Sequence, residues 1–460
     1  MILKKNCVKD FDELIKNHFK HRLTSDQEAL MNVLIKFMTT HTSRPLLIVT
    51  GYAGTGKSSF FGALIKSLKD LKLKACLLAP TGRASKVLSL FANLESSTIH
   101  RKIYFHTKKT DGSYKVNLAP NKHENTLFVI DESSMIPKNK LLHDIINYVY
   151  NGKNCQLIFI GDSGQLPPVG SSFSPALDKT YLKSQFNPLS IYHFHLNEIV
   201  RQHKNSGILY NATNIRNNHI FQSLKSTSFE DVIRVNGMDL QDNLQSSYDK
   251  VGEEETIIIT RSNKRANNYN SHLRNRIFWR EQTIEKGDLI MVIKNNYYWT
   301  EEDKNDFLAN GEIFEVTKFI KEENIYNTTF LRVRIKASEK EREVLLFKDS
   351  FNIESAQLNP EFQNNLFIEV ENDFAYMSNK KDRINAVTSN AYYNALQVKF
   401  AYAITCHKSQ GGQWKHVYID LGYITKDRMD KDFARWLYTA FSRSKEKLYL
   451  INFPEFLFRE

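Results

Sequence analysis

Cysteine is scarce in this chain of 460 residues, and long apolar runs are absent. The four cysteines, at positions 7, 76, 155 and 406, form no CxxC pair, so neither a zinc site nor a disulfide framework is indicated. No run approaches the roughly 20 apolar residues of a membrane helix, and residues 1–22 lack the apolar core of a signal peptide. We therefore expect a soluble protein of the reducing, cytoplasmic compartment with no membrane partner.

Acidic residues are in the minority, at 51 Asp and Glu against 63 Lys and Arg. The resulting formal net charge of +12 favours a polyanionic partner, although an ordinary solvated basic surface would carry the same charge. With 41% hydrophobic residues the chain can form packed cores. Its length suggests about three domains.

The first half of the chain contains four apolar runs separated by helical patterns. This alternation predicts an α/β fold, a parallel sheet with helices on both faces. The runs are PLLIVT (45–50), KACLLAP (74–80), TLFVIDE (126–132) and CQLIFIGD (155–162). Residues 103–118 alternate about an Asp-Gly turn, which predicts a β-hairpin inserted between two strands of the sheet.

The second half repeats the strand-then-helix pattern at residues 255–270 and returns to it in KFAYAIT, residues 399–405. Between them, residues 288–348 give β-rich runs with turn signals, which predict a small barrel. The asparagine-containing patches 295–298 and 359–365 are interpreted as loops. The expected division is an N-terminal helical extension (1–22), a first α/β domain (23–195, with the hairpin insertion at about 101–121), and a second α/β domain (196–285 and 396–460) interrupted by a β-rich insertion and connector (286–395).

The most informative stretch is GYAGTGKS, Gly51 to Ser58, between a predicted strand and a predicted helix. That context is typical of a P-loop, in which glycines let backbone amides curl around a phosphate and the helix N-terminus adds positive charge. Lys57 can reach the β- and γ-phosphates, and the Ser58 hydroxyl can hold Mg²⁺. The stretch therefore predicts binding of a nucleoside triphosphate. The residues expected to contact it are Gly51, Ala53, Gly54, Thr55, Gly56, Lys57, Ser58 and Ser59.

Two acidic residues and a glutamine follow later strands. Asp131 and Glu132 close an apolar strand in VIDES, where Asp131 can share a Mg²⁺ with Ser58 and Glu132 can orient or deprotonate the attacking water. The alternative is that the two acids are simple helix N-caps. Gln165, in GDSGQLPPVG, can contact the γ-phosphate or its water. These residues predict hydrolysis of the triphosphate.

Eight segments occur in the order of the helicase motifs of superfamily 1, and the chain resembles that superfamily over about residues 23–453. They are GYAGTGKS, APTGRA, STIH, VIDES, GDSGQLPP, VRQ, CHKSQGGQ and YTAFSRS. Within the superfamily the chain looks most like the RecD/Dda-like branch, which moves 5′→3′ on DNA. The resemblance implies two RecA-like P-loop NTPase domains, an SH3-like β insertion, and a hairpin similar to a strand-separating pin. The hairpin lacks an obvious aromatic residue at its tip, and Tyr104 and Phe105 lie on its rising arm instead.

The resemblance also assigns residues around ATP. Gln27 in LTSDQ is similar to the glutamine that reads adenine, although an ordinary helix start explains the same pattern. Arg201 in VRQ and Arg443 in YTAFSRS match the two arginines that reach the γ-phosphate from the second domain. Such an arginine stabilises charge in the transition state. Without the motif context, either arginine would be interpreted as a surface ion pair.

The DNA contacts implied by the resemblance lie on both domains. Hydroxyl, amide and cationic groups there suit phosphate contacts, which hold a strand without reading its sequence. The matching residues are Pro80, Thr81, Arg83, Thr98 and His100 in the first domain, and Thr260, Ser262, Asn263, Thr405, His407 and Lys408 in the second.

The motifs together predict an ATP- and Mg²⁺-dependent DNA helicase that acts, as a monomer, on single-stranded DNA and duplex junctions in replication, repair or recombination. Two alternatives stay open. One is an RNA helicase of the same superfamily, and the other is a P-loop protein that uses ATP as a structural switch without turnover. The sequence shows no further carboxylate cluster that would indicate a nuclease.

Overall fold

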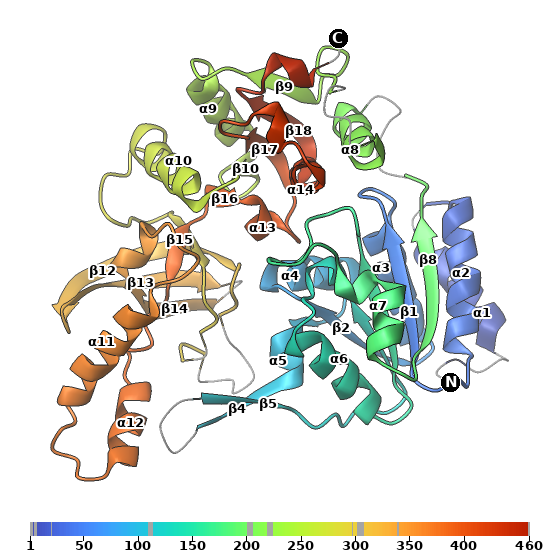
Figure 1. The fold of residues 1–460 in the computed structure, drawn as a ribbon, viewed down its shortest axis with the longest axis horizontal. Helices are drawn as coiled ribbons and strands as arrows, with labels where there is room; N and C mark the ends of the chain where they lie inside the picture. The colour runs from blue at the N-terminus through green and yellow to red at the C-terminus, as the bar shows by residue number, and fades with distance from the viewer. Residues whose placement is uncertain are drawn as a thin grey trace.

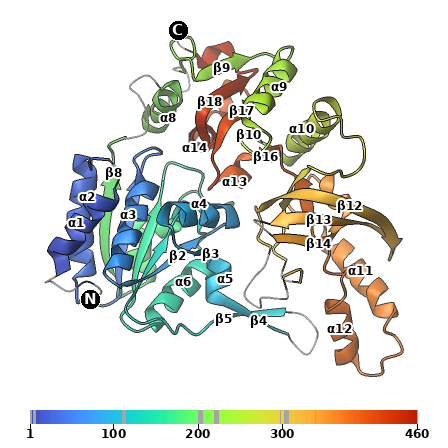
Figure 2. The ribbon, with the colours of Figure 1, turned by 180° about the vertical axis from the view of Figure 1, so that it is seen from behind.

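A computed structural model describes residues 3, 7–19, 21–108, 114–199, 206–218, 224–296, 298–300, 308–337 and 340–458. Figures 1 and 2 show two α/β domains side by side, with a β-rich insertion projecting to one side. The N-terminus lies in the first domain and the C-terminus in the second (Figure 1). No helix of the described residues is long and apolar enough to cross a membrane.

The first domain is built on a six-stranded, wholly parallel sheet with the strand order β3-β2-β6-β7-β1-β8. Apolar side chains line both faces of its central strands, as expected for a sheet covered by helices on each side. The strands are β1 (Pro45–Gly51), β2 (Lys74–Ala79), β3 (Ser96–Thr98), β6 (Thr126–Ile130), β7 (Gln156–Gly161) and β8 (Ser190–Leu196). The helices are α1 (Val8–His18), α2 (Ser25–Met38), α3 (Lys57–Asp70), α4 (Gly82–Ala92), α5 (Ile99–Ile103), α6 (Lys140–Asn151) and α7 (Lys179–Gln185).

The four predicted apolar runs of this domain are strands, and the predicted hairpin is present as the antiparallel pair β4 (Tyr104–Lys108) and β5 (Tyr114–Leu118). Both views place this hairpin on the side of the first domain that faces the insertion (Figures 1 and 2). The hydroxyl of Tyr104 donates to Asp144 of α6 at 2.7 Å, which anchors the base of the hairpin. The strand β8 was not among the predicted runs.

The second domain has a five-stranded parallel sheet with the order β16-β10-β17-β18-β9. Its strands are β9 (Val232–Val235), β10 (Thr256–Thr260), β16 (Ala403–Thr405), β17 (Trp414–Asp420) and β18 (Ser444–Ile451). Its helices are α8 (Gly207–Asn218), α9 (Leu240–Val251), α10 (Asn263–Arg276), α13 (Cys406–Ser409) and α14 (Lys431–Phe441). One large apolar core unites them.

The insertion is an antiparallel sheet with the order β14-β13-β12-β11-β15. The strands are β11 (Leu289–Val292), β12 (Ile313–Ile325), β13 (Thr328–Ala337), β14 (Lys340–Phe347) and β15 (Val398–Phe400). Two backbone hydrogen bonds join its two ends: the Leu396 amide donates to the Leu345 carbonyl, and the Phe347 amide donates to the Leu396 carbonyl. The sheet therefore closes on its own core. Because β15 belongs to this sheet, the insertion continues past residue 395, and the single predicted strand KFAYAIT is split between two sheets.

The patch 359–365 is helical, so its interpretation as a loop was wrong. Two helices, α11 (Pro360–Asn372) and α12 (Lys380–Thr388), project from the sheet of the insertion (Figure 1). Asn359 is the N-cap of α11, since its side chain accepts a hydrogen bond from the Glu361 amide at 3.0 Å, and Pro360 takes the first helical position. Both are start signals for a helix, where asparagine content alone suggested a loop.

Candidate functional site

The P-loop connects β1 to α3 as the sequence predicts. Gly54 and Gly56 adopt positive φ angles of 84° and 76°, a conformation that a glycine reaches without steric cost. A Cβ on Gly51 would lie 2.9 Å from the Leu196 side chain, so the loop also needs a glycine where it leaves β1. The loop therefore presents its amides and the N-terminus of α3 to a cleft between the two domains.

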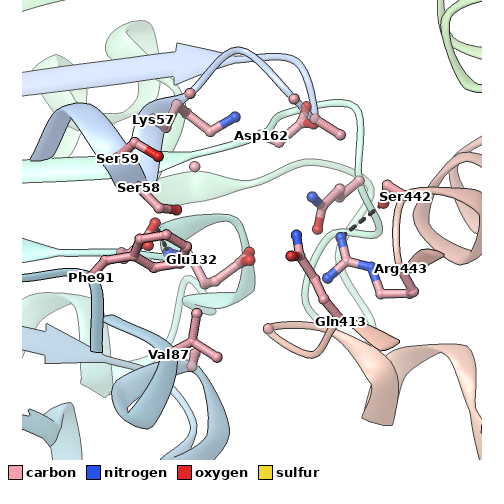
Figure 3. A pocket seen from close by; sticks show the side chains of 18 of the residues that line it. Lys57, Ser58, Ser59, Val87, Phe91, Glu132, Asp162, Gln413, Ser442 and Arg443 are labelled. Carbon is pink, nitrogen blue, oxygen red and sulfur yellow. Dashed lines mark hydrogen bonds between the residues drawn. The ribbon is translucent and has the colours of Figure 1, made fainter. Parts of the chain in front are cut away.

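That cleft has a volume of about 310 Å³ and takes its walls from both domains. Its lining includes the predicted residues Ala53, Gly54, Gly56, Lys57, Ser58, Ser59, Asp131, Glu132, Gln165 and Arg443. In Figure 3, Lys57, Ser58 and Glu132 stand on one side of the cleft, and Arg443 and Gln413 on the other. Thr55 is fully buried beneath the loop, and its hydroxyl donates to the Tyr52 carbonyl.

Lys57 is the cation on the first-domain wall. Its ammonium group donates to the carbonyls of Gly51 and Tyr52, at 2.8 and 2.7 Å. Burial lowers the pKa of Lys57, and the negative charges of Asp162, Asp131 and Glu132 act against that shift. A partly buried ammonium group beside the amides of the P-loop is well placed to attract a phosphate.

The paired acids lie together at the carboxyl end of β6. Burial, and then the neighbouring charge of Glu132, raises the pKa of Asp131 to about 7. The Asp131 carboxylate also accepts the Glu132 amide at 2.8 Å. Glu132 has a φ of +50°, an uncommon backbone conformation for this residue type that is frequent at functional sites. Its side chain is directed into the cleft (Figure 3).

Two acceptor atoms in the cleft are buried without a hydrogen-bond partner among the described residues, Glu132 Oε2 and Gln165 Oε1. Both are oxygens that accept hydrogen bonds, so together they suit a donor such as a water molecule. Ser58 and Asp131 add a hydroxyl and a carboxylate to the same cleft, and oxygen ligands of this kind are the ones that Mg²⁺ prefers. The residues present therefore fit the predicted magnesium ion.

Arg443 reaches the cleft from the end of α14 and is only 3% exposed. Its guanidinium donates to the carbonyls of Thr439 (3.0 Å) and Gly412 (3.2 Å) and to the Ser442 hydroxyl (2.8 Å). No carboxylate among the described residues pairs with it. The arginine is thus fixed in position by its own domain, with its charge directed at the opposite wall (Figure 3).

Of the predicted residues that the structure describes, Gln27, like Gly51 and Thr55, is not in the lining. Gln27 is fully buried, and its side chain completes a capping box with Thr24 at the start of α2 while donating to the Thr55 carbonyl at 3.1 Å. The helix-start interpretation is therefore confirmed, and adenine reading by Gln27 stays a prediction. Arg201 lies outside the described residues.

A groove of about 770 Å³ runs between the first domain and the insertion, and a second of about 450 Å³ continues it along the second domain. Val169, His407 and Lys408 line both grooves. The first groove contains the predicted residues Pro80, Thr81, Arg83, Thr98 and His100, and the second contains Ser262, Asn263 and Thr405. Thr260 is buried and lines neither groove; its hydroxyl donates to the Ser262 carbonyl. Thr81, Thr98 and Ser262 cap the helices α4, α5 and α10 with their side chains.

Three lysines of these grooves have no carboxylate partner among the described residues: Lys294, Lys399 and Lys408. Their ammonium groups donate only to neutral acceptors, which are Gln363, the Ser355 carbonyl and Asn310. Burial lowers the pKa of Lys399 and of Lys408 to about 8, and Lys399 adds to the shift of Lys408. A buried charge is normally paired. These grooves are therefore suited to an anionic ligand. Lys294 and Lys399 carry no motif and were not predicted.

The cleft and grooves define a P-loop NTPase built of two domains, and the comparisons with known proteins specify its kind. Residues 22–237 match the family model of an AAA domain, and residues 400–451 match that of the UvrD-like helicase C-terminal domain. An uncharacterised protein, R530, of Acanthamoeba polyphaga mimivirus is 23% identical over 92% of this chain and 98% of its own length. The ATP-dependent DNA helicase Dda of Enterobacteria phage T4 is 25% identical over 68% of this chain and 70% of its own length. A RecD subunit of the RecBCD enzyme, from Buchnera aphidicola, is 26% identical over 89% of this chain and 71% of its own.

Among solved structures, the Pif1 helicase of Bacteroides in complex with ADP-AlF3 and single-stranded DNA has the same fold, with a TM-score of 0.52 and 18% identity over 96% of this chain and 95% of its own. This likeness confirms the two RecA-like domains. The chain is a superfamily 1 helicase of the branch that contains RecD, Pif1 and Dda. The predicted family is confirmed.

Proposed function

We propose that this chain is an ATP-dependent DNA helicase, which steps 5′→3′ along single-stranded DNA and separates duplexes. One observation carries the proposal: the cleft with the P-loop, the paired acids and Arg443 adjoins a groove whose lysines have no carboxylate partner among the described residues, and residues of both α/β domains line the cleft and the groove. The names of the relatives Dda and Pif1 agree with the activity, and the 5′→3′ direction is typical of their families.

The hydrolytic step is assigned to residues of both walls. Lys57 binds the β- and γ-phosphates, Glu132 takes a proton from the attacking water, and Gln165 orients that water through its free carbonyl oxygen. Ser58 and Asp131 would hold Mg²⁺, which offsets charge on the phosphates when bound. Arg443 stabilises the charge that develops in the transition state from the second domain. We assign Arg201 the same role, by its motif alone.

The strand-binding step is assigned to the two grooves. Thr81 and Arg83 line the first groove from the first domain, and His407 and Lys408 line it from the second. A strand in this groove therefore touches both domains. Phosphate contacts hold a strand of any sequence, as a translocating enzyme requires. Stepping then needs each domain to change its DNA affinity with the state of the nucleotide. The hairpin β4–β5 adjoins the groove through Val116, where a duplex would meet it.

ATPase rates with and without single-stranded DNA, measured alongside unwinding of duplexes with a 5′ or a 3′ tail, test this proposal. We expect stimulation by DNA and unwinding from the 5′ tail only, by a monomer. Stimulation by RNA alone would favour the RNA helicase. ATPase activity that ignores nucleic acid would contradict a motor of either kind, and the absence of multiple turnovers would favour a structural switch.

A further inference from the structure

A buried carboxylate at the ATP cleft has no role in the assignments above. Asp162 follows β7, at the same edge of the sheet as the P-loop, and its side chain is 1% exposed. Arg216 forms an ion pair with its Oδ1 atom, and the Tyr438 hydroxyl donates to its Oδ2 atom at 2.5 Å. The Gly164 amide also donates to Oδ1, at 2.9 Å. Two of these three partners come from the second domain, on α8 and α14.

Arg216 is held between two aromatic rings as well. Its guanidinium carbon lies 4.2 Å from the ring centre of Tyr52, in the P-loop, and 5.3 Å from that of Tyr438. One guanidinium nitrogen donates to the Tyr438 hydroxyl at 3.2 Å. A cation between aromatic faces gains attraction from both rings. The arginine therefore binds the first domain by charge and by stacking at once.

The same residues touch the catalytic loops. The Tyr438 hydroxyl accepts a hydrogen bond from the Ala53 amide of the P-loop at 2.9 Å. Asp162 starts the loop that carries Gln165, and the next residue, Leu166, donates its amide to the Thr439 hydroxyl at 2.9 Å. These contacts couple the positions of α8 and α14 to those of the P-loop and the Gln165 loop.

Arg216 also neutralises a negative charge beside Lys57. Asp162 is close enough to Lys57 to influence its pKa, so a free carboxylate there would repel a triphosphate at the same lysine. Burial acts to raise the pKa of Asp162, but Arg216, Lys57 and the Tyr438 hydrogen bond hold it below the ordinary value. The carboxylate stays ionised, and Arg216 neutralises it.

We propose that Arg216 and Tyr438 form an interdomain clasp on Asp162, which positions the P-loop and the Gln165 loop and offsets a negative charge beside the triphosphate. Arg216 is a positioning residue that acts through Asp162. The proposal rests on the proposed ATPase function, since it concerns the same cleft. It adds the route by which the position of the second domain sets the rate of hydrolysis.

Substitutions of the clasp test this, with a readout that does not need turnover. We compare Arg216→Met, Asp162→Asn and the double variant for the affinity of a fluorescent ADP analogue and for kcat and KM of ATP hydrolysis. Arg216→Met leaves the buried Asp162 carboxylate without its ion pair, so we expect about a tenfold to hundredfold loss in nucleotide affinity and in kcat/KM. Adding Asp162→Asn removes the repelling charge and should restore most of the affinity, while kcat stays low because the loops are no longer held.

An arginine–aspartate pair within the second domain provides the matched control. Arg265 donates to Asp420 at 2.7 Å, away from the cleft, so Arg265→Met should leave nucleotide affinity within about twofold. Wild-type affinity and kcat in Arg216→Met would overturn the proposal. An affinity loss that Asp162→Asn leaves unchanged would overturn it too. If the wild type binds nucleotide but neither hydrolyses ATP nor unwinds DNA, the proposed function fails while the affinity pattern still reports on the clasp.

A substitution at a glycine tests the clasp without replacing any of its three residues. A Cβ on Gly164 would lie 2.6 Å from an Arg216 nitrogen, so Gly164→Ala should displace the guanidinium and reproduce the affinity loss of Arg216→Met. Gly237→Ala is its control, because the added Cβ would approach only Asn452, at 3.7 Å. Thermal melting of each variant separates loss of the clasp from loss of the fold. A folded Gly164→Ala protein with wild-type affinity and kcat would contradict the clasp.

Discussion

The guanidinium carbon of Arg83 lies 3.8 Å from the centre of the Trp414 ring. Arg83 belongs to the first domain, in the predicted strand-binding loop, and Trp414 begins β17 of the second domain. Burial lowers the pKa of Arg83 to about 10. The strand groove is therefore joined to the second domain by a stacked cation, so a change in the angle between the domains also changes the groove.

Replacing Arg83 with lysine should weaken the binding of single-stranded DNA. Lysine keeps the charge but loses the planar stacking on Trp414, and we expect a loss of about threefold to tenfold in affinity. Fluorescence anisotropy of a labelled oligonucleotide measures it. Arg44→Lys is the control, because Arg44 also lies over an aromatic ring, Tyr150, but far from the grooves. Equal effects of the two substitutions would contradict a role for the Arg83 stacking.

Glu132→Gln should bind nucleotide but not turn it over. The amide keeps the size of the side chain and cannot accept the proton of the attacking water, so kcat should fall by about 10² to 10⁴. ATPase assays together with the affinity of a fluorescent nucleotide test this. Lys57→Ala is the comparison, since it should lose binding as well. Normal turnover by purified Glu132→Gln would remove Glu132 as the base.

Arg443→Ala should retain nucleotide binding and lose hydrolysis. Arg443 is fixed by the Thr439 and Gly412 carbonyls, so its charge needs no rearrangement to act on the opposite wall. We expect a fall in kcat of about 10³ or more. Arg443→Lys keeps a charge but loses the fixed geometry, so its kcat should lie between those of the wild type and Arg443→Ala. An unchanged kcat in a folded Arg443→Ala protein would contradict a role for Arg443 in the transition state.

The strand–P-loop–helix unit and the paired acids could be predicted because each consists of residues that are adjacent in the sequence. A buried strand reads as an apolar run, and the P-loop as glycines at fixed spacing. The clasp could not be predicted, because no motif in the sequence relates Arg216 to Asp162, and the two residues meet only where the two domains pack together. Lys399 was missed for a similar reason: KFAYAIT is one apolar run in sequence, yet its residues divide between two sheets. At Asn359 a capping residue was interpreted as a loop residue, since asparagine favours both.

Phe105 should matter for duplex separation more than for ATP turnover. It lies on the rising arm of the hairpin with 43% of its surface exposed, while the neighbouring Tyr104 is tied to Asp144. An exposed ring can stack on a base pair at the fork, worth about 1–3 kcal/mol. We expect Phe105→Ala to slow unwinding about tenfold. The test is unwinding of a 5′-tailed duplex, with DNA-stimulated ATPase measured in parallel. Ile325→Ala, at a partly exposed apolar residue of β12, serves as the control. Equal losses in unwinding and ATPase would argue against a role at the fork.

The affinity for single-stranded DNA should fall as the pH rises from 7 to 9. Burial lowers the pKa of Lys399 and Lys408 to about 8, so above that pH the free protein holds them largely neutral. DNA phosphates favour the charged forms, so binding takes up protons, and affinity should drop by up to about tenfold per pH unit for each proton taken up. Anisotropy titrations at constant ionic strength measure the slope. Lys399→Met should bind more weakly at pH 7 and show a shallower slope. Lys348→Met should retain the wild-type slope, since Lys348 pairs with Glu322 outside the grooves. A flat wild-type profile would show that these lysines do not contact the strand.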